Sequence, residues 1–301
     1  MFLTIDRFKY PVGDDGQNIT PFHADGLGYG NIKIIHHTKR QGVRLKDCCA
    51  ISCTLLPAPG AFLECPAAEL YTLNSKESDM SSTKVMVTGP YGLIAGAIYK
   101  RLQDQPDRYE VHALDRRRQL SERAPKNMAL DIPDERFHLA DLSDLSAVQR
   151  AMEGMEVVVQ MAADPRPEAT WEEILHSNVI GIYNVFEACH QVGVKRVIYA
   201  SSIMTNWGYQ FDEPYKAIKE CRFDDVPENI PIITRRDPTR PTEPYSASKV
   251  WGEGLARMYS DVHGLSCLVL RIGWVNAEDN PYPPELGAVW CSQRDIVQLT
   301  E

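Results

Sequence analysis

The amino-acid sequence predicts an α/β fold in which helices cover both faces of a parallel β-sheet. The first observation is that, from Lys84 onward, short apolar runs of strand length alternate with longer stretches of helical character. That alternation is typical of a doubly wound parallel sheet. The second is a glycine-rich turn between the first of these strands and the first helix. We therefore expect a doubly wound α/β domain.

The expected elements follow one another along the chain in alternating order. The long central helix places Ile182, Val185 and Phe186 on one face, as a helix packed against a sheet requires. The expected strands are Lys84–Thr88, Tyr109–Leu114, Phe137–Leu139, Val157–Met161, Arg196–Ala200 and Ser266–Leu270, and the expected helices are Leu93–Leu102, Thr170–Gln191 and Tyr245–Val262.

The bulk composition of the 301-residue chain bears on its partners. Its formal net charge of -9 argues against nucleic-acid binding, which usually needs a basic excess. No apolar stretch approaches the length of a membrane span, and the first residues lack the basic and apolar regions of a secretion signal. We expect a cytoplasmic protein that binds a small molecule and neither nucleic acid nor membrane.

The chain divides near residue 80. Residues 1–79 show weak periodicity and many turn-forming residues, whereas residues 80–301 carry the alternation of strands and helices. We predict that residues 1–79 form a poorly ordered extension, with a small accessory domain as the alternative. Residues 80–301 are expected to form the cofactor-binding domain.

The eight cysteines predict no metal site. Four of them cluster in the N-terminal region, but their spacing fits no zinc knuckle and no histidine follows at ligand spacing. We expect reduced, unpaired thiols. The clustered residues are Cys48, Cys49, Cys53 and Cys65, and the scattered ones, expected to be small buried residues, are Cys189, Cys221, Cys267 and Cys291.

The turn after the first strand has the spacing of a dinucleotide-binding motif, Gly-x-x-Gly-x-x-Ala. Gly89 can adopt the backbone angles of a tight turn, Gly92 lets a pyrophosphate approach the main chain, and Ala95 lets the helix pack closely on the strand. The helix N-terminus then offers free N–H groups and a positive dipole end to the phosphates. This motif, between a strand and a helix, predicts a Rossmann-type fold.

The second strand indicates which dinucleotide is bound. Asp115 ends this strand, where a carboxylate can accept hydrogen bonds from the adenosine ribose and repel a 2′-phosphate. Arg116, Arg117 and Arg118 follow and offer two alternatives, a site for that phosphate or a solvated loop. The position of the acid favours NAD over NADP.

Two more strand ends are expected at the cofactor crevice. Asp141 and Leu142 follow the third strand, and Met161, Ala162 and Ala163 lie at the end of the fourth. Asp141 is a candidate for the adenine amino group, and an N-cap of a following helix is the alternative.

A tyrosine and a lysine four residues apart carry the predicted chemistry. Tyr245 and Lys249 lie on one face of a helix, so both side chains can enter one pocket. A nearby ammonium stabilises a phenolate and lowers its pKa, which would make Tyr245 a general base toward a substrate hydroxyl. Ser201 and Ser202 end the fifth strand and compete for a hydrogen bond to the reacting oxygen, or merely form a turn.

In order and context, these motifs resemble the extended short-chain dehydrogenase/reductase superfamily, broadly the NAD-dependent epimerase/dehydratase family. The resemblance covers roughly residues 83–300 and includes Asn178-Val-x-Gly. It implies Ser202, Tyr245 and Lys249 as the catalytic trio, with Lys249 bonded to the nicotinamide ribose. The cofactor-binding residues predicted in all are Gly89, Tyr91, Gly92, Leu93, Ile94, Asp115, Arg116, Asp141, Leu142, Met161, Ala162, Ala163, Asn178, Tyr245 and Lys249.

Within that superfamily the sequence is most similar to uronate dehydrogenases. This resemblance implies Ser202, Ile203 and Arg271 as substrate-binding residues, with Arg271 meeting a carboxylate or, alternatively, serving as a structural arginine. Uronate dehydrogenases usually continue with Asn-His after the paired serines, where this chain has Ile203 and Met204. Sugar-nucleotide dehydratases have an Asp-Glu pair at this place, so Ile203 and Met204 argue against a dehydratase.

The expected substrate-site segments are residues 203–244 and 272–301, the second forming a small, incomplete C-terminal part compared with family members. The first hypothesis is an NAD-dependent dehydrogenase acting on a sugar or sugar-acid hydroxyl. The alternatives are a sugar-nucleotide epimerase that keeps its NAD tightly bound and a non-catalytic NAD-binding protein. The resemblance also implies a possible homodimer.

Overall fold

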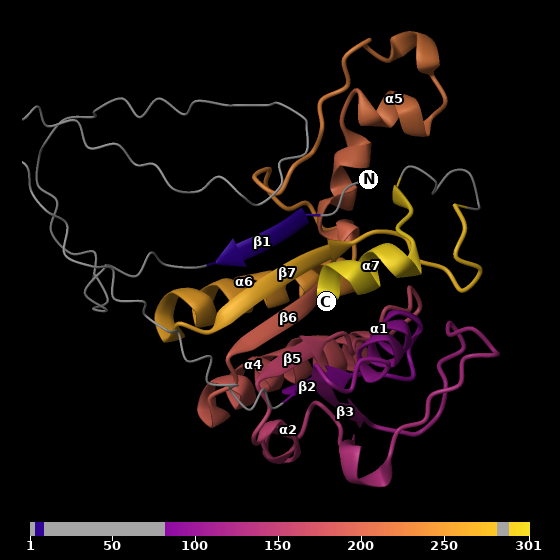
Figure 1. Cartoon of the computed structure of the whole chain (residues 1–301). Helices are drawn as coiled ribbons and strands as arrows, with labels where there is room; N and C mark the ends of the chain where they lie inside the picture. Colours follow the sequence, from indigo (N-terminus) through magenta and orange to yellow (C-terminus); the bar gives the residue numbers. More distant parts are fainter. Residues whose placement is uncertain (1–3, 9–81, 282–288) are drawn as a thin grey trace, which may run out of the picture. The chain divides into compact units, whose positions relative to one another are not determined.

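The computed structural model describes residues 4–8, 82–281 and 289–301. These residues form a seven-stranded sheet (Figure 1). Its strands are β1 Thr4–Phe8, β2 Thr83–Thr88, β3 Tyr109–Asp115, β4 Phe137–Leu139, β5 Val157–Gln160, β6 Arg196–Ser202 and β7 Ser266–Ile272. The spatial order is β1-β7-β6-β5-β2-β3-β4. Strands β2 to β7 are parallel, and β1 pairs with β7 in the antiparallel direction.

The order of the parallel strands reverses between β2 and β5. From β2 the chain adds β3 and β4 on one side, then returns and adds β5, β6 and β7 on the other. This arrangement confirms the predicted Rossmann-type, doubly wound sheet. In such sheets a ligand binds beyond the carboxyl ends of the strands at the reversal, so the ends of β2 and β5 locate the site.

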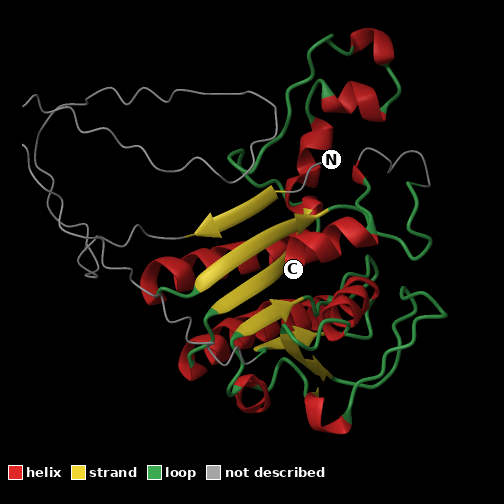
Figure 2. Cartoon of the chain, viewed as in Figure 1, coloured by secondary structure: helices red, strands yellow, loops and turns green. Residues whose placement is uncertain are grey.

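Helices cover both faces of the sheet (Figure 2). Buried residues of α2, α4 and α6 pack on one face, and those of α1 and α7 pack on the other. The helix bounds are α1 Leu93–Gln103, α2 Leu145–Met152, α3 Trp171–Ile174, α4 Gly181–Val192, α6 Pro244–His263 and α7 Gln293–Thr300, and a π-helical segment, η2 Leu175–Ile180, joins α3 to α4.

Burial on both faces explains why β2 carries apolar residues at consecutive positions. Val85 and Val87 point into the core shared with α1, while Met86 points into the core shared with α2 and α4. On the latter face Phe186 stacks on Tyr259, with 5.6 Å between ring centroids, and meets the edge of Tyr199 at 5.9 Å. Such aromatic pairs add about 0.5–1.5 kcal/mol each beyond the area that they bury.

The predicted strands and helices differ from the observed ones mainly at their ends. The π-helical segment divides the predicted long helix, and β6 and β7 each extend two residues further than expected. Helix α2 entered the predictions only as the alternative in which Asp141 caps a following helix. Its N-cap is Asp144, whose carboxylate accepts from the Ala147 N–H.

Most of the N-terminal region lies outside the described residues. The exception is β1, which places Thr4 opposite Arg271 along β7. The clustered cysteines also lie outside the described residues. Among the cysteines that are described, three are buried as predicted, but Cys221 is exposed because it lies in a surface turn with a φ of 57°. No helix within the described ranges is long and apolar enough to cross a membrane.

Two segments extend from the sheet at its carboxyl edge. The first, residues 203–244, contains the 3-10 helix η3 Ile203–Phe211, the short helix α5 Tyr215–Lys219 and the 3-10 turn η4 Phe223–Asp225. The second follows β7: the Trp274 N–H donates to the Val289 carbonyl, and the Cys291 N–H donates to the Trp274 carbonyl, both at 2.8 Å. Both segments were predicted to carry the substrate site.

Candidate active site

Side-chain hydrogen bonds tie the ends of β2 and β5 together. The Thr88 hydroxyl donates to Gln160 Oε1 at 2.8 Å and accepts from the N–H groups of Met161 and Ala162 at 3.0 and 3.1 Å. The Gln160 amide then donates to the Ala162 carbonyl at 2.8 Å. Because both side chains are almost fully buried and satisfied, they fix the separation of the two strand ends.

The glycine turn sits directly on this junction. Gly89 has a φ of 68°, and a Cβ placed there would lie 3.1 Å from Cα and Cβ of Ala162. Gly92 is the N-cap of α1, and a Cβ there would lie 3.2 Å from the Gly89 carbonyl oxygen. A side chain at either glycine would therefore crowd the turn, and at Gly89 it would also strain the backbone.

The N-terminus of α1 is available to an anion. The N-cap residue of this helix is Gly92, which has no side chain to accept from the first N–H groups, and among the described residues no acid lies in the first turn. Its first N–H groups therefore point outward with the positive end of the helix dipole. Gly96 has a role that the sequence did not reveal, since a Cβ there would press on Met128 and on the Pro90 carbonyl. These features fit the pyrophosphate of a dinucleotide.

Asp115 lies beside the same turn, at the end of β3. The backbone N–H groups of Arg116, Arg117 and Tyr91 face its carboxyl group and act to lower its pKa. Burial nevertheless raises the pKa of Asp115, because desolvation outweighs their effect. Asp115, which was predicted to bind the ribose, is thus adjacent to the glycine turn that was predicted to bind the phosphates. Tyr91 and Arg116 contribute backbone N–H groups to the same corner.

Asp141 occupies a turn after β4. Its carboxylate accepts from the Ser143 N–H at 2.8 Å and from the Ser143 hydroxyl at 2.7 Å, and these bonds hold the pKa of Asp141 below its usual value. The alternative of an N-cap is wrong, because Asp144 performs that role. The neighbouring Leu142 packs against Gly181 of α4.

Asn178 connects the cofactor side to the catalytic helix. Its amide nitrogen donates to the Asp164 carbonyl at 2.9 Å and to the Ser248 hydroxyl at 3.3 Å, and its oxygen accepts from the Asp164 N–H at 2.7 Å. The side chain is 1% exposed. Asn178 therefore joins the loop after β5, which contains Ala163, to α6.

The three predicted catalytic residues are brought together at the end of β6. The Ser202 hydroxyl lies beside the phenol of Tyr245, close enough to act on its pKa. The Lys249 ammonium lies 5.5 Å from the centroid of the Tyr245 ring and donates to the Ala200 carbonyl at 2.8 Å. Of the two competing serines, it is Ser202 that contacts Tyr245.

The electrostatics of this trio differ from the sequence-based expectation. Burial lowers the pKa of Lys249 to about 8. Burial also raises the pKa of Tyr245, against the opposing effects of the Ser202 hydroxyl and the positive charge of Arg123. The expectation that Lys249 lowers the pKa of Tyr245 is therefore not met, because desolvation of the phenolate dominates.

The remaining two candidate substrate residues, Ile203 and Arg271, lie in different surroundings. Ile203 follows Ser202 and begins η3. The guanidinium of Arg271 forms a bidentate pair with Glu253 of α6, Nε to Oε1 at 2.8 Å and Nη2 to Oε2 at 2.7 Å. This geometry favours the structural alternative for Arg271, since two N–H groups along the edge of its guanidinium are taken up by a protein carboxylate.

One cation near Tyr245 was not identified from the sequence. Arg123 belongs to the loop after β3, which is tied to the glycine turn by a hydrogen bond from the Ser121 N–H to the Tyr91 carbonyl at 2.9 Å. Its charge acts on Tyr245, and it forms no ion pair with the described residues. Arg123 was missed because it lies far from the other motifs in the sequence.

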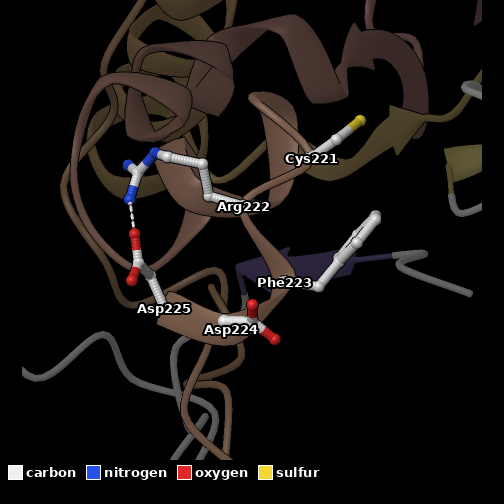
Figure 3. Close-up of a pocket in the computed structure, with 5 residues that line it drawn as sticks. All are labelled: Cys221, Arg222, Phe223, Asp224 and Asp225. Atoms are coloured by element: carbon white, nitrogen blue, oxygen red, sulfur yellow. Dashed lines mark hydrogen bonds and ion pairs between the residues drawn. The ribbon is translucent and has the colours of Figure 1, made fainter.

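A shallow hollow is visible elsewhere on the surface (Figure 3). It is lined by the consecutive residues 221–225, and Arg222 pairs there with Asp225, Glu213 and Glu220. None of the predicted site residues lines it, and the charge of its arginine is already neutralised. We therefore place the candidate active site at the carboxyl ends of β2, β5 and β6.

The arrangement matches a family known from other proteins. The model of the NAD dependent epimerase/dehydratase family matches residues 85–285. The chain belongs to this family. Family membership confirms the predicted class of enzyme and NAD as the cofactor of the family.

Curated relatives match the chain over different lengths. The chain is 33% identical over 222 residues to an NAD-dependent glucose-6-phosphate dehydrogenase of Haloferax volcanii, covering 72% of this chain and 78% of the relative. It is 32% identical over 169 residues to a uronate dehydrogenase of Pseudomonas putida, covering 56% of this chain and 55% of the relative. An L-arabinose 1-dehydrogenase of H. volcanii is 37% identical over 141 residues. The chain spans about half the length of the last two.

Solved structures agree with the fold. Uronate dehydrogenase from Agrobacterium tumefaciens has a TM-score of 0.55 at 28% identity, with 73% of this chain and 71% of that chain covered. A mutant of the same enzyme complexed with NAD has a TM-score of 0.54 at 27% identity, with the same coverage. The similarity that the sequence suggested to uronate dehydrogenases is therefore confirmed.

Proposed function

We propose that the protein is an NAD-dependent oxidoreductase that acts on a hydroxyl group of a sugar or sugar acid. The observation that carries the proposal is the meeting of Tyr245, Ser202 and Lys249 at the end of β6, on the same sheet edge as the glycine turn. The relatives, which are dehydrogenases of glucose 6-phosphate, L-arabinose and uronates, suggest the substrate class.

The residues of the cofactor corner fit NAD. Gly89 and Gly92 leave space that a Cβ would fill, α1 presents its N–H groups, and Asp115 stands beside them for the ribose hydroxyls. When bound, NAD⁺ would accept hydride from the substrate carbon, and its positive charge would favour the phenolate of the tyrosine.

In the proposed reaction, Tyr245 takes the proton from the substrate hydroxyl as the carbon loses hydride. Ser202 lies beside Tyr245 and would donate a hydrogen bond to the same substrate oxygen, which would hold that oxygen beside the base. Lys249, fixed on the Ala200 carbonyl, would contribute a positive charge and a donor for the nicotinamide ribose. In the reverse direction Tyr245 returns the proton to the carbonyl oxygen.

The experiment follows NADH formation with NAD⁺ and a panel of glucose 6-phosphate, L-arabinose, other aldoses and uronic acids. Tyr245→Phe is expected to reduce turnover by about 100- to 10,000-fold, the usual contribution of a general base. Tyr183→Phe, on an exposed tyrosine of α4, is the matched control and should leave turnover unchanged. Full turnover by Tyr245→Phe would overturn the assignment of the base.

The epimerase alternative uses the same base but recycles its cofactor within one turnover. It predicts that NAD stays with the protein through purification and is released only on denaturation. If the protein oxidises no compound of the panel but releases stoichiometric NAD on denaturation, the epimerase is favoured. A panel without turnover and without NAD binding would contradict both enzymatic proposals.

A further inference from the structure

Helix α6 is joined to the end of β6 by three side chains on one face of the helix. Tyr245, Lys249 and Glu253 follow one another at intervals of four residues, so they point in the same direction. Figure 1 shows α6 beside β6 and β7. Tyr245 contacts Ser202, Lys249 donates to a backbone carbonyl of β6, and Glu253 accepts from the Ser201 hydroxyl at 2.5 Å.

The third contact continues onto the next strand. Arg271 lies opposite Ser201 in the pairing of β6 with β7, and its guanidinium meets Glu253 through two parallel hydrogen bonds. Glu253 thus accepts from both strands at once. Its side chain is 14% exposed and that of Arg271 is 9% exposed, so water has little access to the pair.

Burial of this pair argues for a role in orientation. Removing two charges from water costs about as much as their attraction returns, so a buried ion pair seldom stabilises a fold. A bidentate pair does restrict geometry, because both hydrogen bonds form only at one distance and one angle. A second feature also requires close contact here: a Cβ at Gly252 would collide with the Tyr199 hydroxyl of β6.

We propose that Glu253 and Arg271 are positioning residues, which hold α6 at the height on β6 where the Tyr245 hydroxyl meets Ser202. This inference rests on the proposed function of Tyr245. Neither residue touches the reacting atoms. A displacement of α6 by about 1 Å would separate the base from its partner, and displacements of that size can reduce turnover about 100-fold.

The test uses a double variant that keeps the fold. Removing one partner alone would leave a buried charge and could unfold the protein. Glu253→Leu combined with Arg271→Met removes both charges and fills the space with apolar groups. The control is Arg257→Gln, which breaks the exposed pair between Arg257 and Asp261 on the same helix.

We expect the double variant to unfold near the parent temperature, to bind NAD with parent affinity and to turn over about 10- to 100-fold more slowly, with KM little changed. Loss of Ser202 as a partner should also raise the pKa of Tyr245, so the rise of kcat/KM with pH moves to higher pH. Glu243, Arg123 and Lys249 remain in place around the phenol in both proteins. A folded double variant with parent kcat and parent pH profile would overturn the proposal.

A readout that does not need turnover separates the two proposals. The phenol of Tyr245 can be titrated by NMR with ring-labelled tyrosine, assigned from the signal missing in Tyr245→Phe. If no substrate is found but the double variant raises the pKa of Tyr245, the positioning role stands while the proposed function fails. An unchanged Tyr245 titration would overturn the positioning role whether or not the protein turns over a sugar.

Discussion

The substitution Gly89→Ala tests whether the turn after β2 is built for a dinucleotide. A residue with a Cβ pays about 1–2 kcal/mol in the left-handed region that Gly89 occupies. The added Cβ would also lie 3.1 Å from the Cα and Cβ of Ala162, tighter than ordinary van der Waals contact. Because Thr88 holds the Ala162 N–H, that backbone cannot retreat without breaking the junction of β2 and β5. We therefore expect the turn itself to shift.

The matched control is Gly193→Ala. Gly193 has a φ of 79°, but a Cβ there would meet nothing within 4 Å. This variant should lose about 1–2 kcal/mol of unfolding free energy and keep its NAD affinity. Gly89→Ala should lose at least as much stability and bind NAD at least about tenfold more weakly, which is about 1.4 kcal/mol. Urea unfolding and calorimetric NAD titration measure the two effects, and parent NAD affinity in Gly89→Ala would refute the reasoning.

Three further predictions concern charge. In the parent protein the unfolding free energy should rise by about 3 kcal/mol between pH 8 and 10.5, because folded Lys249, with its pKa lowered to about 8, loses its proton before the unfolded chain does. Lys249→Met should abolish this rise, as measured by urea unfolding across pH. Arg123→Gln removes a charge that lowers the pKa of Tyr245, so the rise of kcat/KM with pH should move to higher pH, and an unmoved profile would contradict this. Asp115→Ser removes the carboxylate that repels a 2′-phosphate, so the ratio of the Kd values for NADP and NAD should fall at least about tenfold; an unchanged ratio in paired titrations would show that Asp115 does not select the cofactor.

The cofactor half of the candidate site could be predicted because its chemistry is encoded locally. Gly89, Gly92 and Ala95 belong to one turn, and the backbone angles and close approaches that they permit follow from their lack of bulk. Asp115 ends the next strand, and in a parallel sheet consecutive strand ends meet at one edge. The succession of strands along the chain, the turn and the acid therefore follow from the sequence pattern.

The parts that could not be predicted depend on contacts between distant segments. The sequence left two uses open for Arg271, because a strand-end arginine can meet a substrate or a protein carboxylate. Only the fold brings Glu253 to it. The same limit applies to Arg123 near Tyr245, and to the pKa of Tyr245, where the balance between a nearby ammonium and desolvation depends on how deeply the helix packs.

These two kinds of information correspond to two ways of holding a site. The cofactor corner is shaped mainly by backbone and by two satisfied side chains, Thr88 and Gln160, so it tolerates little change in the turn but needs few distant partners. The catalytic corner depends on where α6 lies along β6, and side chains set that position. The double variant Glu253→Leu with Arg271→Met should therefore reduce turnover while sparing NAD binding, whereas Gly89→Ala should weaken NAD binding. A chain in which both classes of variant changed NAD binding equally would show that the two corners are not held independently.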